Sequence, residues 1–157
     1  MSALDAVSMN AREVLLEALM SVAWADRTLA EEERRAAQAA AMSLGLVLPG
    51  DRDLTSPDRR PLTPEALPVA GLGDRDRELI YLCAAWMALA DNVEDPTEQS
   101  MLDRIGRRLA LPPDRLAWLR ERAAVLRQEQ TPDATWWRAF DRLVVSAARA
   151  MATARGE

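Results

Sequence analysis

The chain has 157 residues, 49% of them hydrophobic, and a net charge of −5, with no histidine, one cysteine and 20 basic residues that are all arginine. These absences exclude sites that use an imidazole base, most zinc sites, lysine Schiff bases and internal disulfides. The length suits a single domain with its own core, and the acidic balance argues against a nucleic-acid partner.

The predicted elements point to one fold class. Alanine occupies 29 positions, and no alternating run of strand length is present. We therefore predict an all-α fold, a single-domain bundle of about six to seven helices. The first predicted helix begins at Asn10 and ends near residue 25, and the second spans residues 28–43. Each begins with a capping-box pattern, in which a polar residue is followed three positions later by glutamate.

Residues 47–75 differ from their surroundings because they are rich in proline and glycine. We interpret them as a long linker with one short helix near Pro64–Leu67, and expect it to cross the surface and be the most mobile part.

The remaining predicted helices follow the linker. The third, residues 74–90, is apolar on every side, so it should be the buried central helix. A fourth begins at Pro96, and Pro112-Pro113 and Thr131-Pro132 open the C-terminal helices within residues 113–155.

Part of the sequence repeats at a constant offset of 65 residues. The aligned identities are Ala23, Ala25, Asp26, Glu33, Leu44 and Leu46 with Ala88, Ala90, Asp91, Glu98, Leu109 and Leu111. Both acidic positions coincide with predicted helix boundaries. We therefore predict two duplicated helical hairpins, residues 11–46 and 76–111.

The first hairpin resembles the TerB-like domains of tellurite-resistance proteins, a group that includes the N-terminal domain of the DnaJ-like protein DjlA. The resemblance lies in Ala25-Asp26, Leu29, Glu33 and Leu44-Gly45-Leu46. The second hairpin matches less fully, through Ala90-Asp91, Glu98 and Leu109-Ala110-Leu111. Arg27 and Asn92 stand where the family has glycine, and Glu94 stands where it has an apolar residue.

The resemblance implies a non-catalytic stress-response or envelope-associated module that binds protein partners, either in the cytoplasm or peripherally at the inner membrane. It also implies a divalent-metal site formed by the acidic residues of both repeats, Asp26, Glu33, Asp91 and Glu98. Oxygen ligands of this kind suit Ca²⁺, Mg²⁺ or Mn²⁺.

Helix capping is an alternative explanation of the same four residues. Glu98 fits a capping box, Glu33 is an acid in a first helical turn, and the two aspartates suit helix ends. Neither turn is an EF-hand, because Val93 and Leu102 stand where ligands would be required.

Other residues suggest a second function, a metal-free interaction or assembly subunit. Trp136 and Trp137 are adjacent, so both are not expected to be equally buried in one helix, and one is a candidate contact for a partner. Six arginines lie between residues 104 and 122: Arg104, Arg107, Arg108, Arg115, Arg120 and Arg122. We favour an ion-paired, solvated face for them, with contact to an anionic lipid or acidic protein as the alternative.

The remaining candidates are interpreted as core residues. Trp24, Trp86 and Trp118 have the spacing of packed aromatic side chains. Cys83 lies inside the apolar run and is expected to be an inert, buried thiol with a raised pKa. A carboxylate-based hydrolase is the third alternative for the acidic residues, but we expect no catalysis.

Overall fold

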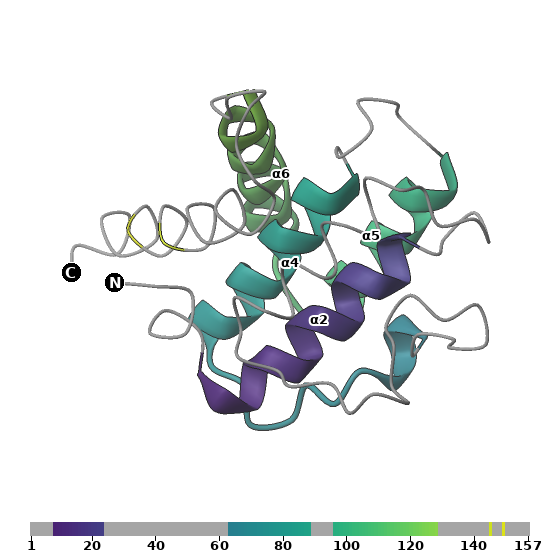
Figure 1. Cartoon of the computed structure of the whole chain (residues 1–157), viewed down its shortest axis with the longest axis vertical. Coiled ribbons are helices and arrows are strands. Elements are labelled where there is room, and N and C mark those ends of the chain that lie inside the picture. The colour runs from purple at the N-terminus through teal and green to yellow at the C-terminus, as the bar shows by residue number, and fades with distance from the viewer. Residues whose placement is uncertain (1–7, 24–62, 89–95, 129–144, 146–148, 150–157) are drawn as a thin grey trace, which may run out of the picture.

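The computed structural model describes residues 8–23, 63–88 and 96–128, together with residues 145 and 149. This part of the chain contains four α-helices, one short 3₁₀ helix and no strand (Figure 1). They are α2 (Met9–Ala23), η1 (Pro64–Ala66), α4 (Asp74–Ala88), α5 (Pro96–Arg108) and α6 (Pro113–Gln128). The expected all-α class is confirmed for the described residues.

Helices α2 and α4 form a parallel central pair. The Ser8 hydroxyl donates a hydrogen bond to the Asp76 carboxylate at 2.8 Å, which places the beginnings of both helices together. They pack against each other along their lengths (Figure 1), and each is 15 residues long. Their last described residues, Ala23 and Ala88, therefore lie at the same end of the pair.

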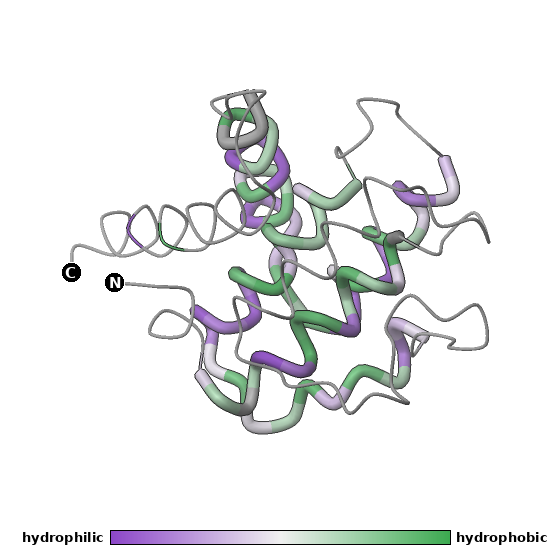
Figure 2. The backbone as a smooth tube through the Cα atoms, in the orientation of Figure 1, coloured by the Kyte–Doolittle hydropathy of each residue, from purple (hydrophilic) through white to green (hydrophobic). Residues whose placement is uncertain are grey.

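Helix α4 is the centre of the core, as its apolar sequence predicts. Every residue from Glu78 to Ala88 is buried, and Tyr81 and Trp86 are its largest fully buried side chains. Hydrophobic residues run along α2 and α4, whereas hydrophilic residues mark the start of α4 (Figure 2). Burial of a large apolar side chain contributes about 1.5–3 kcal/mol, so this helix contributes most to the stability of the core.

Helices α5 and α6 cover α4 from other sides. Leu102 and Ile105 of α5, Leu109 just after it and Leu119 of α6 are buried in the same core. Gly106 allows the close approach of the two helices, because a Cβ atom there would lie 3.0 Å from the Leu116 side chain and 3.3 Å from the Tyr81 ring.

The segment before α4 contradicts the expected surface linker. Residues 63–73 include η1, as predicted, but Leu67, Val69 and Leu72 are buried in the main core. Apolar side chains at nearly alternate positions give an extended segment one face that packs inward. This part of the predicted linker thus belongs to the core.

Arg77 fastens that segment to the end of α5. Its guanidinium donates to three backbone carbonyl oxygens, those of Leu72 at 3.1 Å, Val69 at 3.3 Å and Leu109 at 2.8 Å. We call this set of contacts the Arg77 clamp. Arg108 adds a similar bond to the Leu67 carbonyl at 3.0 Å. The Leu67 and Val69 carbonyls also accept turn hydrogen bonds from the N–H groups of Val69 and Leu72, so the arginines add a second donor to each.

The helix boundaries agree with the sequence except at the first helix. It begins at Met9, so Asn10 lies inside α2 and does not cap it, and Ser8 takes the preceding position that favours a small polar residue. The starts at Pro96 and Pro113 are confirmed. The second predicted helix lies outside the described residues, as does the last one apart from residues 145 and 149, which are helical.

Helix α5 ends in a Schellman motif whose left-handed position holds alanine. Ala110 has φ of 56°, its N–H donates to the Arg107 carbonyl at 3.0 Å, and the Leu111 N–H donates to the Gly106 carbonyl at 3.4 Å. The motif normally places glycine there, because a Cβ atom raises the energy of this conformation.

Replacing Ala110 with glycine should therefore raise the free energy of unfolding by about 0.5–1 kcal/mol. This is the left-handed strain that glycine relieves, minus the extra conformational entropy that glycine loses on folding. Chemical denaturation measures the difference. Ala117→Gly, at an exposed position inside α6, is the control and should lower stability by about 1 kcal/mol. Destabilisation by both substitutions would contradict the strain argument.

Removing the Arg77 clamp should be far more damaging than removing an exposed arginine. Arg77→Met loses three charge-assisted hydrogen bonds, and we expect the free energy of unfolding to fall by about 3 kcal/mol. Arg122→Met, on the exposed face of α6, should stay within about 0.5 kcal/mol of the parent chain. Equal losses in urea unfolding would show that the clamp contributes nothing specific.

Candidate functional site

Only one of the four predicted metal ligands lies within the described residues. Glu98 sits in the first turn of α5 and is 2% exposed. Asp26, Glu33 and Asp91 lie outside the described residues. Within the part of the chain that is described, no group of three or more potential side-chain ligands comes together.

Glu98 lies near the carboxyl end of the central helix pair. Helix α5 begins eight positions after Ala88 and contacts both α2 and α4, and its first turn lies at the end where those helices finish (Figure 1). Neither α2 nor α4 has a basic residue in its last turn. Each helix end carries a partial negative charge of about half an elementary charge. Partial charges of this sign favour positive charge at this end of the pair.

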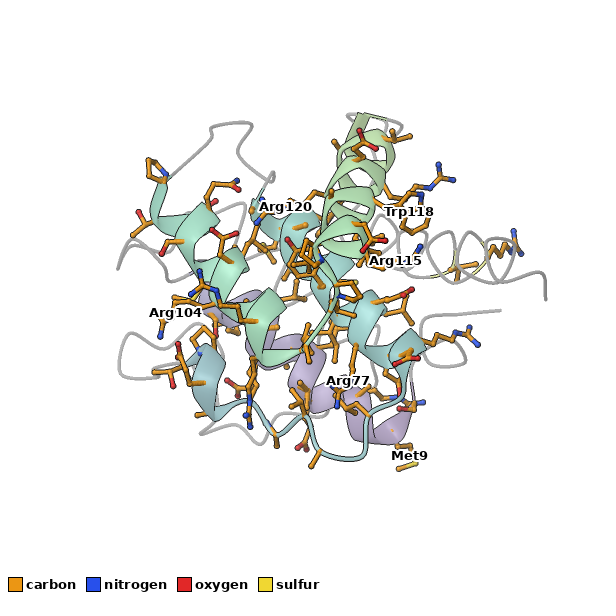
Figure 3. All side chains as sticks on the ribbon, turned by 180° about the vertical axis from the view of Figure 1, so that it is seen from behind. Met9, Arg77, Arg104, Arg115, Trp118 and Arg120 are labelled. Carbon is orange, nitrogen blue, oxygen red and sulfur yellow. The ribbon has the colours of Figure 1, made fainter. Side chains whose placement is uncertain are left out.

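A second group of polar contacts joins α4 to α6. Arg115 makes a two-pronged ion pair with the buried Glu78, at 3.1 and 2.8 Å, and its guanidinium lies 4.5 Å from the centre of the Trp118 ring. Figure 3 shows Arg115 and Trp118 close together on α6. The planar guanidinium suits both contacts at once, which a lysine would not.

Arg120 links three helices. It donates to the Tyr81 hydroxyl of α4 at 2.5 Å and pairs with Asp103 of α5. Burial raises the pKa of the Tyr81 phenol above its ordinary value, so the hydroxyl stays neutral and accepts the bond from Arg120.

An open pocket lies between η1 and α5. Its volume is about 320 Å³, and the described residues that line it are Glu65, Arg104, Arg107 and Arg108. Glu65 and Arg104 form a two-pronged ion pair across it, at 2.7 and 2.5 Å. The hydrogen bonds from Arg104 lower the pKa of the Glu65 carboxyl to about 2, so the pair stays ionised at neutral pH.

The favoured interpretation of the arginine-rich stretch as an ion-paired face is confirmed for three of its six arginines. Arg104, Arg115 and Arg120 pair with acidic residues. Arg107 and Arg122 are exposed, and neither makes an ion pair with any residue of the described part. Sequence spacing did not reveal the partners, because Glu65 and Glu78 lie 39 and 37 positions away.

The residues that were interpreted as core residues differ in how deeply they are buried. Trp86 is fully buried, as expected, whereas Trp118 is half-buried and stacks against Arg115. Cys83 is a buried free thiol, and burial raises its pKa to about 12. Trp24, Trp136 and Trp137 lie outside the described residues.

Among the described helices, none combines the length and apolar character needed to cross a membrane. Comparisons of the chain with protein-family models, with curated proteins and with solved structures find no match.

Cys83 provides a test of core packing. Its pKa of about 12 means that the folded state holds the proton which the unfolded chain loses near pH 9. The free energy of unfolding is therefore unaffected by this thiol below about pH 8.5 and should fall by about 1.4 kcal/mol per pH unit above pH 9.

The measurement is urea unfolding between pH 9 and 10, with Cys83→Ala compared at each pH because the unfolded chain's tyrosine begins to ionise in the same range. In Cys83→Ala the free energy of unfolding should fall less steeply with rising pH, because the contribution of the thiol is gone. A native protein whose thiol reacts with a disulfide reagent as fast as an unfolded peptide would contradict the assigned burial.

Proposed function

We propose that this chain is a TerB-like helical module that performs no catalysis and binds protein partners in a stress-response or envelope setting. In this proposal Asp26, Glu33, Asp91 and Glu98 hold one divalent cation of the Ca²⁺, Mg²⁺ or Mn²⁺ type. The cation would fasten the two repeats to each other and so set the shape that a partner recognises.

The observation that carries the proposal is the parallel packing of α2 and α4. Asp26 and Asp91 each follow the last described helical residue, Ala23 or Ala88, by three positions. Three residues of chain reach at most about 11 Å. We therefore expect both aspartates at the carboxyl end of the pair, where Glu98 is buried. An antiparallel pair would have separated them by the length of a helix.

The helix boundaries add support for the duplication. Helix α2 begins at Met9 and α4 begins at Asp74, so their starts differ by the offset of 65. At the same offset Arg12 and Glu13 align with Arg77 and Glu78, the residues of the clamp and of the buried ion pair. Equivalent residues at equivalent helix positions are expected of a duplicated hairpin.

The end of α5 supports the same alignment. Ala110 adopts the left-handed conformation that glycine favours, and the residue aligned with it in the first repeat is Gly45. The TerB-like pattern also has a small residue between two leucines at this point. Ala110 in the second repeat thus adopts a left-handed conformation that glycine, the residue at the aligned position of the first repeat, would adopt with less strain.

The electrostatic argument favours a cation over simple capping. Two parallel helices direct two carbonyl ends at one region, and neither helix supplies a basic residue to its own last turn. Adding several carboxylates to such a region is unfavourable unless they are protonated or bind a positive ion. A hard divalent ion with oxygen ligands meets that requirement.

The metal-free interaction subunit receives less support. It relied on Trp136 and Trp137, which lie outside the described residues, and on the arginine stretch. In that stretch Arg104, Arg115 and Arg120 pair with acidic residues of the chain itself. That leaves three arginines, Arg107, Arg108 and Arg122, without an ion pair to a described residue and so available to an acidic partner.

Isothermal titration with Mn²⁺, Ca²⁺ and Mg²⁺ tests the metal site. The variant should be Asp26→Asn with Asp91→Asn, because Glu98 is buried and its replacement would also disturb packing. We expect uptake of one ion by the parent chain and a loss of affinity of at least about tenfold in the variant, since removal of ligand charge weakens hard-cation binding.

The matched control is Glu13→Gln with Glu121→Gln, two exposed acids on α2 and α6 that change the net charge equally. It should bind the ion as the parent does. Bound ion should also raise the unfolding temperature of parent and control but not of the aspartate variant. Absence of uptake by the parent, or equal uptake by all three proteins, refutes the metal site.

A further inference from the structure

The pocket between η1 and α5 has the charge and donors of an anion site. Arg104, Arg107 and Arg108 occupy positions i, i+3 and i+4 of α5, so they share one face of the helix. Arg104 projects from this face toward η1 (Figure 3), where Glu65 holds it. Three positive side chains and one negative side chain give the described residues of the lining a net charge of +2.

Two of the three guanidinium groups are held in place while keeping free donors. Glu65 accepts from Nε and one terminal nitrogen of Arg104, and the Leu67 carbonyl accepts from Nε of Arg108. The terminal nitrogens of Arg108 make no hydrogen bond to any described residue, and the guanidinium of Arg107 makes none within that part of the chain. Binding an anion would therefore require little reorganisation.

The last carbonyl groups of α5 would repel an anion, but hydrogen-bond donors of the chain already bond to them. The N–H groups of Ala110 and Leu111 bond to the carbonyls of Arg107 and Gly106, and Arg77 bonds to the carbonyl of Leu109. These contacts offset much of the partial negative charge at the helix end. The guanidinium groups therefore dominate the potential in the pocket.

We propose that this pocket binds a phosphate group carrying two negative charges. The flat guanidinium fork matches phosphate oxygens, and the charge of −2 balances the lining. The volume of about 320 Å³ accommodates a phosphate with a small attached group. The source is either a small soluble phosphate ester or the head group of an anionic lipid, which share this chemistry.

Inorganic phosphate is the first probe, added at constant ionic strength to the ¹⁵N-labelled protein while the arginine Nε–H signals are followed by NMR. We expect the signals of Arg107 and Arg108 to shift at millimolar phosphate. Arg107→Gln should weaken binding about tenfold, because it removes a charge-assisted contact. Arg122→Gln is its matched control, an exposed arginine with equal charge change on α6, and should alter affinity less than twofold.

Glu65→Gln tests the phosphate site with a substitution that should raise the affinity. It removes the negative charge from the lining and frees Arg104, so phosphate should bind about threefold more tightly. No shift of Arg107 or Arg108 with millimolar phosphate overturns the proposal. Equal weakening by Arg107→Gln and Arg122→Gln, or weaker binding by Glu65→Gln, overturns it as well.

Two further probes distinguish the sources. Glycerol 3-phosphate represents a soluble ester, and vesicles of phosphatidylcholine with or without phosphatidic acid represent a membrane. Sedimentation only with phosphatidic acid, lost in Arg107→Gln, assigns the site to a lipid head group. Binding of glycerol 3-phosphate without sedimentation assigns it to a soluble ligand, and binding of neither overturns the proposal.

Discussion

The Arg77 clamp is the interaction on which the arrangement of the described helices depends. One guanidinium bonds to the carbonyls of Val69 and Leu72 before α4 and of Leu109 at the end of α5. These segments are far apart in the sequence and carry carbonyl groups that must be satisfied when buried. The clamp fixes the position of the end of α5 relative to α4. It therefore also fixes the orientation of the α5 face that lines the pocket between η1 and α5.

Much of the helical framework could be predicted because its signals are local. The continuous apolar run predicted the buried α4, and prolines at the first helical position predicted the starts of α5 and α6. The buried segment before α4 was missed, since its prolines and glycines suggested a linker while Leu67, Val69 and Leu72 pack into the core. Their nearly alternate spacing was the available signal.

The polar contacts were much harder to predict than the helices. Arginine has five donors and a long side chain, so its partner is decided by tertiary packing and not by spacing. The sequence suggested a paired face for the arginine stretch but identified neither Glu65 nor Glu78 as partners. Of the predicted metal ligands, only Glu98 is described. Its burial agrees with either a ligand or a capping residue. The parallel packing of α2 and α4 is therefore the stronger argument for the metal site, and no local sequence pattern reveals that packing.

The use of arginine in every one of these contacts has a consequence for tolerance of acid and alkali. A guanidinium keeps its proton at any pH that a folded protein meets, whereas lysine at the same position would lose its charge in strong alkali. The acidic partner then determines where a contact fails. For the pair between Glu65 and Arg104 the carboxyl pKa of about 2 lies below its ordinary value of 4.5, so its contribution declines only as the pH falls through that interval. The surface pair between η1 and α5 should therefore persist in moderately acidic surroundings.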